Sequence, residues 1–448
     1  MNHSALPSDG PPWLRRLHLA MSNAHMADVF AGSWSWARQR GLEVTDCQLQ
    51  RVFPRGEGEF LIEYSIGLCG ADGQFQQPVL AEMIDGDLAT QRASILQSLR
   101  KSRRRQLSNQ QDDDGVGILA DPGLLVRLPG LDQRLTGLGL LKDADRLRGA
   151  VANILACEPD RICDARSEIL GHRLGKRCIA RCHYQCLDGN PEPSLIVKLY
   201  KSRNNRGAAV HAAMKALWAN GWNDPSDTRV PRPLLWCTDS NSLWMEDVKA
   251  TPLAELPAQR HQDAVRNAGR TLARLHRTRI DVSNRYTVDD ETALLERWIQ
   301  LINEVFPGRA KHLTAIMSQL RSALGRCLPS STALVHRDFY DKQILVGQDS
   351  TTLIDFDTLS LGDAALDIGN FLAHLQLLRL QGLGEFTDAE AAFLAGYGDT
   401  DPDMEQRIAV YTAATRLRLA CLYSFWPRWS QVSAPLLEGI DDDIRATE

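Results

Sequence analysis

The chain has 448 residues, of which 44% are hydrophobic and 24% are charged, and its formal net charge is −5 at pH 7. This length is sufficient for two or three packed domains. The slightly acidic balance argues against nucleic acid or an anionic membrane surface as the main partner.

The composition of the chain predicts a cytoplasmic protein. No segment approaches the ~18 apolar residues that span a bilayer, and the first residues lack the apolar core of a secretion signal. The ten cysteines include no Cys-x-x-Cys pair, which indicates reduced thiols. We therefore expect a cytoplasmic location and no membrane partner, and the sequence leaves the oligomeric state open.

Three regions follow one another along the chain. Residues 1–150 mix helical and strand patterns, residues 151–248 are rich in strands, and residues 249–448 are mainly helical. The expected fold class is therefore α+β, with a β-rich part and a helical part that are preceded by an additional α+β domain.

The middle region predicts a small sheet. Alternating apolar and polar residues give three strands, joined by turns at residues 171–176 and 188–190 and followed by a helix and two further strands. We expect these strands at residues 166–170, 178–186, 194–200, 234–237 and 243–246, and the helix at residues 207–219.

Three cysteines in the second of these strands raise the question of a metal site. Cys178, Cys182 and Cys186 share one face of a strand, where residues four apart lie ~13 Å from each other. One tetrahedral ion cannot reach all three thiolates. We therefore interpret the three cysteines as core residues.

The first region contains a hairpin pattern similar to that of the middle region. Gly58 and Ile62 hold the same relative places as Gly175 and Ile179. A cysteine and a following Asp-Gly pair also recur in both regions.

The two hairpin patterns differ at one charged position. Where the middle region has Lys198, the first region has Glu82. Two explanations remain open: a duplicated unit whose first copy lost the lysine, and a chance similarity between two amphipathic hairpins. A duplication requires the same strand order in both copies.

The third region begins with amphipathic helices. Val265, Ala268, Leu272 and Leu275 recur at helical spacing, which predicts a stripe that faces the core. Between residues 333 and 355 the helical pattern gives way to two short apolar strands joined by a tight turn.

The segment around these two strands carries the side chains best suited to chemistry. It reads LVHRDFYDKQILV over residues 334–346, and LIDFD follows over residues 353–357. The strands place Asp338 and Gln343 before the first strand and Asp355 after the second, so three oxygen-bearing side chains converge. Oxygen ligands of this kind suit Mg²⁺.

Phosphoryl transfer needs a group that orients the acceptor hydroxyl, metal ligands, and a cation on the nucleotide phosphates. Asp338 can supply the first, and Gln343 with Asp355 can supply the second. Lys198, on an apolar strand of the middle region, can supply the third. The spacing His-x-Asp-x4-Gln followed by Ile-Asp-Phe-Asp is far more specific than a lone glycine pattern.

This segment resembles the catalytic loop of the aminoglycoside phosphotransferase and choline kinase superfamily, which shares its fold with protein kinases. The stretches GDAALDIGNF at residues 362–371 and LARLH at residues 272–276 are similar to further motifs of the superfamily. The resemblance implies a bilobal protein-kinase-like fold, with a β-rich N-lobe over residues 151–248 and a helical C-lobe over residues 249–448. Residues 1–150 would form a cap-like domain.

The resemblance also implies roles for residues of the catalytic loop and the sheet. Asp338 would be the catalytic base. Asp355 would be the main Mg²⁺ ligand, with Gln343 beside it. Lys198 would hold the α- and β-phosphates of ATP.

The remaining contacts to the nucleotide would come from the backbone. Backbone groups of Glu246 and Val248 match the adenine-binding hinge of the superfamily. The glycine turn that contains Gly171 and Gly175 would cover the phosphates through its N–H groups.

Other polar residues of the segment receive structural interpretations. Asp367 would brace the catalytic loop, and His336 is interpreted as a loop brace and not as a catalyst. For Asp357, a second metal ligand and a loop cap remain equally open. We expect residues 340–342 to be exposed loop residues.

The implied function is an ATP- and Mg²⁺-dependent transfer of phosphate to a hydroxyl of a small molecule such as a sugar, an amino alcohol or an aminoglycoside. Two departures support an alternative, a pseudokinase that binds nucleotide and regulates. Gln343 stands where the superfamily has asparagine, and the helix after Lys198 has no glutamate, with His211 nearest to its place. A protein kinase is disfavoured because only nine residues separate Asp357 from Asp367.

Overall fold

The computed structural model describes residues 10–104, 115–187, 193–201, 205–327, 329, 331–383 and 388–446. The predicted turn at residues 188–190 lies outside these residues. The chain forms two compact units, the first of Met1–Asn204, Trp236–Trp244 and Phe425–Arg428, and the second of Asn205–Leu235, Met245–Ser424 and Trp429–Glu448. The predicted division into domains 1–150, 151–248 and 249–448 stays a prediction.

The first unit begins with three helices and a five-stranded antiparallel sheet. The strand order of this first sheet is β1-β2-β3-β5-β4. The elements are α1 (Pro12–Ala20), α2 (Asn23–Ser33), α3 (Ser35–Gln39), β1 (Glu43–Gly56), β2 (Glu59–Gly70), β3 (Gly73–Met83), α4 (Leu88–Arg104), β4 (Val116–Leu119) and β5 (Leu124–Arg127).

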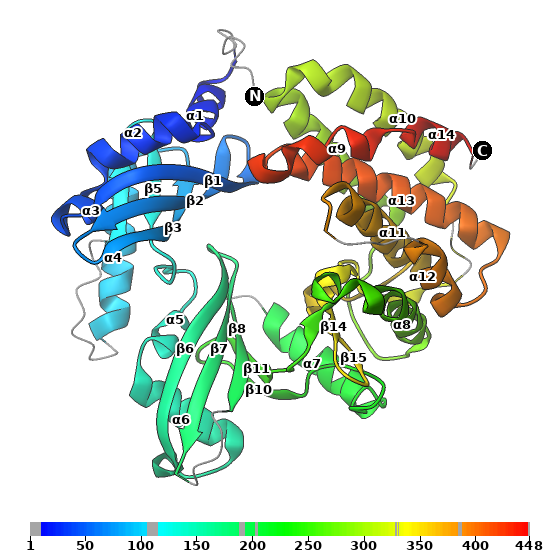
Figure 1. Cartoon of the computed structure of the whole chain (residues 1–448), viewed down its shortest axis with the longest axis horizontal. Coiled ribbons are helices and arrows are strands. Elements are labelled where there is room, and N and C mark those ends of the chain that lie inside the picture. Colours follow the sequence, from blue (N-terminus) through cyan, green and yellow to red (C-terminus); the bar gives the residue numbers. More distant parts are fainter. Residues whose placement is uncertain are drawn as a thin grey trace. The chain divides into compact units, whose positions relative to one another are not determined.

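Alternation of side chains along β2 gives the first sheet one apolar face. Phe60, Ile62 and Tyr64 are buried on this face. Helix α2 packs on β1 (Figure 1). Phe30 of α2 meets the ring of Tyr64 edge-on at 5.6 Å between centroids. The Tyr64 hydroxyl donates to the carbonyl of Ala20 at 2.6 Å. The N-terminal helices therefore cover this face and are fixed to it.

A second five-stranded sheet follows in the chain, with the strand order β6-β7-β8-β11-β10. Its five strands confirm those predicted for the middle region. The first strand, β6, is longer than the predicted 166–170, because its pairing with β7 extends beyond both predicted ends. The boundary between the two units passes through β10 and β11. The elements are α5 (Leu138–Leu141), α6 (Ala144–Leu155), β6 (Ile162–Arg173), β7 (Arg177–Cys186), β8 (Ser194–Tyr200), α7 (Arg206–Ala219), β10 (Pro233–Cys237) and β11 (Ser242–Glu246).

The two sheets have the same connectivity. In each, three consecutive strands are followed by a helix and by two strands, and the last strand in sequence lies beside the third. A chance similarity between two hairpins predicts no agreement in the later strands. The common strand order therefore supports the duplication.

The register corrects one residue equivalence predicted from the sequence. Glu82 pairs with Leu61, and Lys198 pairs with Ile179. If Glu82 corresponds to Lys198, then Leu61 and not Ile62 corresponds to Ile179, because Leu61 is the residue that pairs with Glu82. The turn between β1 and β2 has two residues, and the turn between β6 and β7 has three. Gly58 is therefore one residue closer to Leu61 than Gly175 is to Ile179.

The cysteines of β7 lie where the core interpretation places them. Cys178 and Cys182 are buried, and burial raises the pKa of each thiol to about 12. Cys186 is half-buried. Among the described residues, no group of three or more His, Cys, Asp or Glu side chains is placed to hold a metal ion.

The second unit is mainly helical. Helix α8 packs along α12, and α11 packs along α13. The predicted stripe of α8 is confirmed, because its four residues are 0% exposed. The helices are α8 (Ala258–Arg277), α9 (Val288–Val305), α10 (Ala310–Gly325), α11 (Ala364–Leu380), α12 (Ala389–Tyr397), α13 (Pro402–Tyr423) and α14 (Ile440–Arg445).

Two glycines permit the close approach of α8 and α12. A Cβ atom at Gly269 would lie 2.1 Å from the carbonyl oxygen of Phe393, and one at Gly396 would lie 2.0 Å from that of Arg266. Both distances are too short for any side chain, so the two helix backbones are in contact. This packing fixes the C-terminal end of α8.

Two small sheets carry the predicted catalytic segment. One has the order β12-β14-β15-β9, and the other pairs β13 with β16. The two predicted short strands are confirmed as β14 and β15. The strands are β9 (Thr228–Arg229), β12 (Thr251–Pro252), β13 (Ala333–Val335), β14 (Ile344–Val346), β15 (Thr351–Leu353) and β16 (Ser360–Gly362).

These elements confirm the predicted fold class, a β-rich part and a mainly helical part with an additional α+β region at the N-terminal side. None of the helices in the described ranges is long and apolar enough to span a membrane.

Candidate functional site

Asp338 and Gln343 lie together in the loop between β13 and β14. Gln343 ends a short 3₁₀ turn, Asp341–Gln343, in which its N–H donates to the carbonyl of Tyr340 at 3.0 Å. Its side-chain Nε2 lies 3.5 Å from Oδ2 of Asp338. Gln343 is buried and Asp338 is half-buried.

Asp355 follows β15 and is held beside the same loop. The N–H of Ile354 donates to the carbonyl of Gln343 at 3.0 Å, which joins the two segments. Asp355 has φ +65° and ψ +67°, in the left-handed region that L-residues rarely adopt. Strained backbone of this kind gathers at functional sites, where the surrounding structure maintains it.

The electrostatics of Tyr340 show that the carboxylates gather in one place. Burial raises the pKa of the Tyr340 hydroxyl, and the negative charges of Asp338, Asp341 and Asp355 raise it further. The structure therefore brings Asp338, Gln343 and Asp355 together, as the segment predicts.

Asp367, in the first turn of α11, braces the loop that contains Asp338. It is 0% exposed, and its carboxylate accepts the N–H groups of His336 and Arg337 at 2.6 Å each. The Nε2 atom of His276, at the end of α8, lies 3.2 Å from the same carboxylate. The predicted bracing role is confirmed.

His336 is a second brace. Its ring is buried, and Nε2 donates to the carbonyl of Ile354 at 2.9 Å. The hydroxyl of Thr358 donates to the carbonyl of His336 at 2.8 Å. His336 therefore joins the loops of Asp338 and Asp355 and has no contact that suits a catalyst.

Two further residues support the loop and were not predicted. Arg337 has φ +68°, and its guanidinium lies 3.5 Å from the centroid of the Tyr286 ring. Asn370 donates through Nδ2 to the carbonyl of Phe339 at 2.8 Å. Asn370 could have been recognised as a polar residue in an otherwise apolar stretch, whereas Tyr286 lies 51 residues before Arg337 and gives no local signal.

The expectation that residues 340–342 are exposed is wrong for two of them. Lys342 is exposed, Tyr340 is half-buried, and Asp341 is 3% exposed. Burial raises the pKa of the Asp341 carboxyl to about 6, and Asp341 Oδ2 is buried without a hydrogen-bond partner. The short 3₁₀ turn directs this side chain inward, which the sequence does not reveal.

Lys198 belongs to the first unit. It lies on β8, opposite Ile179 of β7, and is 5% exposed. Its Nζ lies 5.6 Å from the centroid of the Tyr200 ring on the same face of the strand. A meeting of Lys198 with Asp338 and Asp355 around one triphosphate stays a prediction, as does a carboxylate partner for the lysine.

Gly171 lies near the end of β6, and Gly175 lies in the turn between β6 and β7. Gly171 follows a register shift in β6 and is exposed. Gly175 is buried and has φ +67°, which only glycine adopts readily. Its N–H donates to Oδ2 of Asp132 at 2.5 Å.

Glu246 and Val248 lie at and after the end of β11. The N–H of Glu246 donates to the carbonyl of Arg232 at 3.0 Å, and its carboxylate accepts the side chain of Arg229. The carbonyl of Val248 accepts the N–H of Ala250 at 3.1 Å. An adenine contact here would therefore use the carbonyl of Glu246 and the N–H of Val248.

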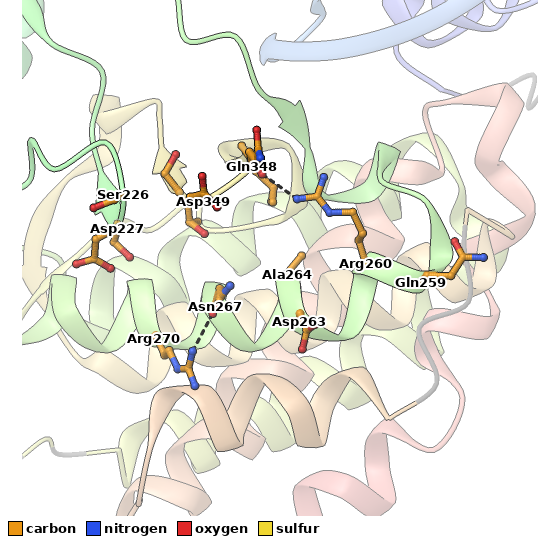
Figure 2. A pocket seen from close by; sticks show the side chains of 15 residues that line it. Ser226, Asp227, Gln259, Arg260, Asp263, Ala264, Asn267, Arg270, Gln348 and Asp349 are labelled. Carbon is orange, nitrogen blue, oxygen red and sulfur yellow. Dashed lines mark hydrogen bonds between the residues drawn. The ribbon is translucent and has the colours of Figure 1, made fainter.

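A polar hollow of about 470 Å³ lies elsewhere on the second unit (Figure 2). It is bordered by α8 and by the turn between β14 and β15. Arg260 donates to the carbonyl of Gly347 at 2.8 Å, and Arg270 donates to Asn267 at 3.0 Å. None of the predicted catalytic or metal-binding residues lines this hollow.

Comparison with known proteins agrees with the catalytic segment. A model of the phosphotransferase enzyme family matches residues 180–409, which is 230 of the 448 residues. A search of curated proteins gives no match.

Among solved structures, a choline/ethanolamine kinase family protein from Mesorhizobium loti has a TM-score of 0.47 and 16% identity, over 68% of this chain and 94% of its own. A choline kinase from Streptococcus pneumoniae has a TM-score of 0.45 and 14% identity, over 67% of this chain and 98% of its own. A spectinomycin phosphotransferase in complex with ADP and spectinomycin has a TM-score of 0.43 and 12% identity, over 64% of this chain and 93% of its own.

Proposed function

The chain belongs to the phosphotransferase enzyme family and is a small-molecule kinase, and from this premise we propose that it transfers the γ-phosphate of ATP to a hydroxyl of its acceptor with the help of Mg²⁺. The observation that carries the proposal is the braced loop that brings Asp338, Gln343 and Asp355 together. We propose a sugar, an amino alcohol or an aminoglycoside-like compound as the acceptor.

The donor atoms of this loop fit Mg²⁺. Asp355 offers a carboxylate and Gln343 an amide oxygen, and Mg²⁺ prefers oxygen ligands and keeps several positions for water and phosphate. Two protein ligands are therefore sufficient. When bound, the ion would neutralise charge on the phosphates.

Asp338 would act on the acceptor hydroxyl. Its carboxylate is half-buried, and the side-chain Nε2 of Gln343 lies 3.5 Å from Oδ2, which orients the carboxylate that would take the hydroxyl proton. The backbone of this loop is fixed by the hydrogen bonds to Asp367, which limits its movement during the transfer.

The nucleotide would be held by the sheet and the segment after it. Lys198 is nearly buried on its strand, and a lysine in such a place is a strong phosphate ligand once the phosphates are present. The carbonyl of Glu246 and the N–H of Val248 would bind the edge of the adenine. The turn that contains Gly171 and Gly175 would cover the phosphates through backbone N–H groups other than that of Gly175, which donates to Asp132.

The test is an acceptor screen with purified protein, in which ADP formation is measured over sugars, amino alcohols and aminoglycosides. Asp338→Asn should retain ATP binding and lose ~10²–10⁴-fold in turnover, because it removes a general base. Asp349→Asn is the control, since Asp349 is exposed in the turn between β14 and β15.

Two results would contradict the proposal. Unchanged turnover in Asp338→Asn would exclude the assigned base. Binding of Mg-ATP by the wild-type protein without turnover on any acceptor would favour the pseudokinase alternative.

A further inference from the structure

The tip of the β6–β7 turn is buried, although a hairpin tip is normally exposed. Leu174 is 1% exposed and packs with Leu61 and Leu80 of the first sheet, and Phe53 lies against the same cluster. All of these residues belong to the first unit. Burial of this leucine removes apolar surface from water, so the first sheet holds the tip in place.

A buried carboxylate holds the turn on its other side. Asp132 is 3% exposed and accepts the N–H of Gly175 at 2.5 Å and the N–H of Arg134 at 2.9 Å. The ring of His172 approaches the same carboxylate, with Nε2 at 3.3 Å, while its Nδ1 accepts the N–H of Gly130 at 3.1 Å. Nδ1 is thus the acceptor of the ring, and Nε2 carries the proton that is donated to Asp132.

Asp132 is an anion in this setting. Burial alone would raise its pKa, but the hydrogen bonds from His172, Gly175 and Arg134 together lower the pKa below its ordinary value. Arg55 of β1 completes the arrangement, because its guanidinium donates to the carbonyl of Leu174. The turn is therefore held at its carbonyl, its N–H and its side chain.

The turn also borders a cavity of about 660 Å³ within the first unit, lined by both sheets. Phe53 and Glu63 line it from the first sheet, and Gly171, Arg173 and Ile179 line it from the second. The guanidinium of Arg173 lies 5.0 Å from the centroid of the Phe53 ring. Ile179 of β7 pairs with Lys198 of β8, the proposed phosphate ligand, so both side chains lie on the same face of the second sheet.

We propose that the first sheet anchors the glycine turn, and that Asp132, Arg55 and Leu174 are positioning residues for nucleotide binding. This inference rests on the proposed function. The N–H of Gly175 donates to Asp132, and the N–H of Lys176 donates to the carbonyl of Arg173 at 2.9 Å. The place of the turn is thus set before ATP binds, which lowers the entropy lost on binding.

The experiment compares wild type, Asp132→Ala and Asp132→Asn in two measurements. The first is hydrogen exchange of peptides that span residues 170–178, without nucleotide. The second is the KM for ATP against kcat with the acceptor found in the screen. Asp143→Ala is the matched control, because Asp143 also accepts a backbone N–H, that of Arg146 at 3.1 Å, but caps α6 and does not touch the turn.

We expect Asp132→Ala to accelerate exchange in the turn and not in β1–β3. We also expect it to raise the KM for ATP about tenfold, with kcat changed less than threefold, as the loss of a charged hydrogen bond predicts. Asp132→Asn keeps one acceptor oxygen and should fall between wild type and Asp132→Ala. It also serves where Asp132→Ala does not fold.

Three results would overturn the inference. An unchanged KM for ATP with faster exchange would mean that the anchor is structural only. A lowered KM would mean that Asp132 withholds the Gly175 N–H from the phosphates. Unchanged exchange would mean that the anchor does not hold the turn in solution. A wild-type protein that neither binds nor consumes ATP would instead refute the proposed function.

Discussion

The first and second sheets share one strand order and differ in the charge of their third strand. Lys198 of β8 and Glu82 of β3 occupy equivalent places by register. Lys198 is nearly buried beside Tyr200, whereas Glu82 is 2% exposed and surrounded by arginines. The same framework thus carries a cation in one copy and an anion in the other.

The surroundings of Glu82 distinguish the first sheet from the second. Its carboxylate pairs with Arg55 at 2.7 Å, with Arg134 at 3.4 Å and with Arg127. A carboxylate at this place repels phosphate, and of the arginines paired with it Arg127 is buried, Arg55 is largely buried and Arg134 is 43% exposed. The first sheet has therefore become a support.

The two glycine turns, between β1 and β2 and between β6 and β7, pack against different elements. Gly58 of the first turn lies against α1, where a Cβ atom would be 3.1 Å from the ring of Trp13. The second turn lies against the first sheet through Leu174 and Asp132. Each turn is covered by the element that precedes its sheet in the chain.

The largest effect is expected from removal of the charge at Glu82. Glu82→Gln leaves buried arginines without their anion and should lower the free energy of unfolding by ~3–5 kcal/mol. Chemical denaturation measures the loss. Glu63→Gln is the control on the neighbouring strand, because Arg51 at 3.3 Å is half exposed and its pair with Glu63 should contribute less than ~1 kcal/mol. An equal loss of unfolding free energy in the two variants would show that the Glu82 carboxylate does not balance the charge of the arginines around it.

The next effect is the converse change in the second sheet. Lys198→Met keeps the length of the side chain and removes the cation, and should lower kcat/KM ~10²–10³-fold while the free energy of unfolding changes little. Lys201→Met is the control, because Lys201 is exposed just beyond the end of β8. If Lys198→Met lost stability and not activity, the lysine would have a structural role like that of Glu82.

The catalytic loop could be predicted from the sequence because its residues are close together in the chain. Asp338, Gln343 and Asp355 fall within 18 residues, and short strands with a tight turn leave few arrangements for them. The braces at His336 and Asp367 follow from the same segment.

The turn anchor could not be predicted, because its contacts join residues far apart in the chain. Asp132 lies 43 residues from Gly175, and Arg55 lies 119 residues from Leu174. No periodicity links such pairs, and a buried aspartate in a loop looks like any polar loop residue. The similarity of the two sheets was visible in the sequence only as a hairpin pattern, since the later strands of the two sheets have different lengths and side chains.

The smallest effect concerns a second buried acid that, unlike Glu82, has no arginine beside it. The pKa of Asp341 is raised to about 6 from an ordinary 3.8, mainly by burial and in part by the charge of Glu255, while Lys342 acts in the opposite direction. The folded chain thus holds this proton more tightly than the unfolded chain. Stability is therefore lost as the pH rises from about 4 to about 6, up to about 3 kcal/mol above that range.

Asp341→Asn removes this loss without changing the shape of the side chain. The midpoint of thermal unfolding should rise relative to wild type at pH 7 and should differ little at pH 4, so the difference between the two proteins grows with pH. Asp349→Asn, at an exposed position, should show no such trend. A difference in midpoint that is the same at pH 4 and pH 7 would mean that water or a cation reaches the Asp341 carboxylate. Asp341 and Glu82 would then differ in the partner of the carboxylate and not in the cost of its burial.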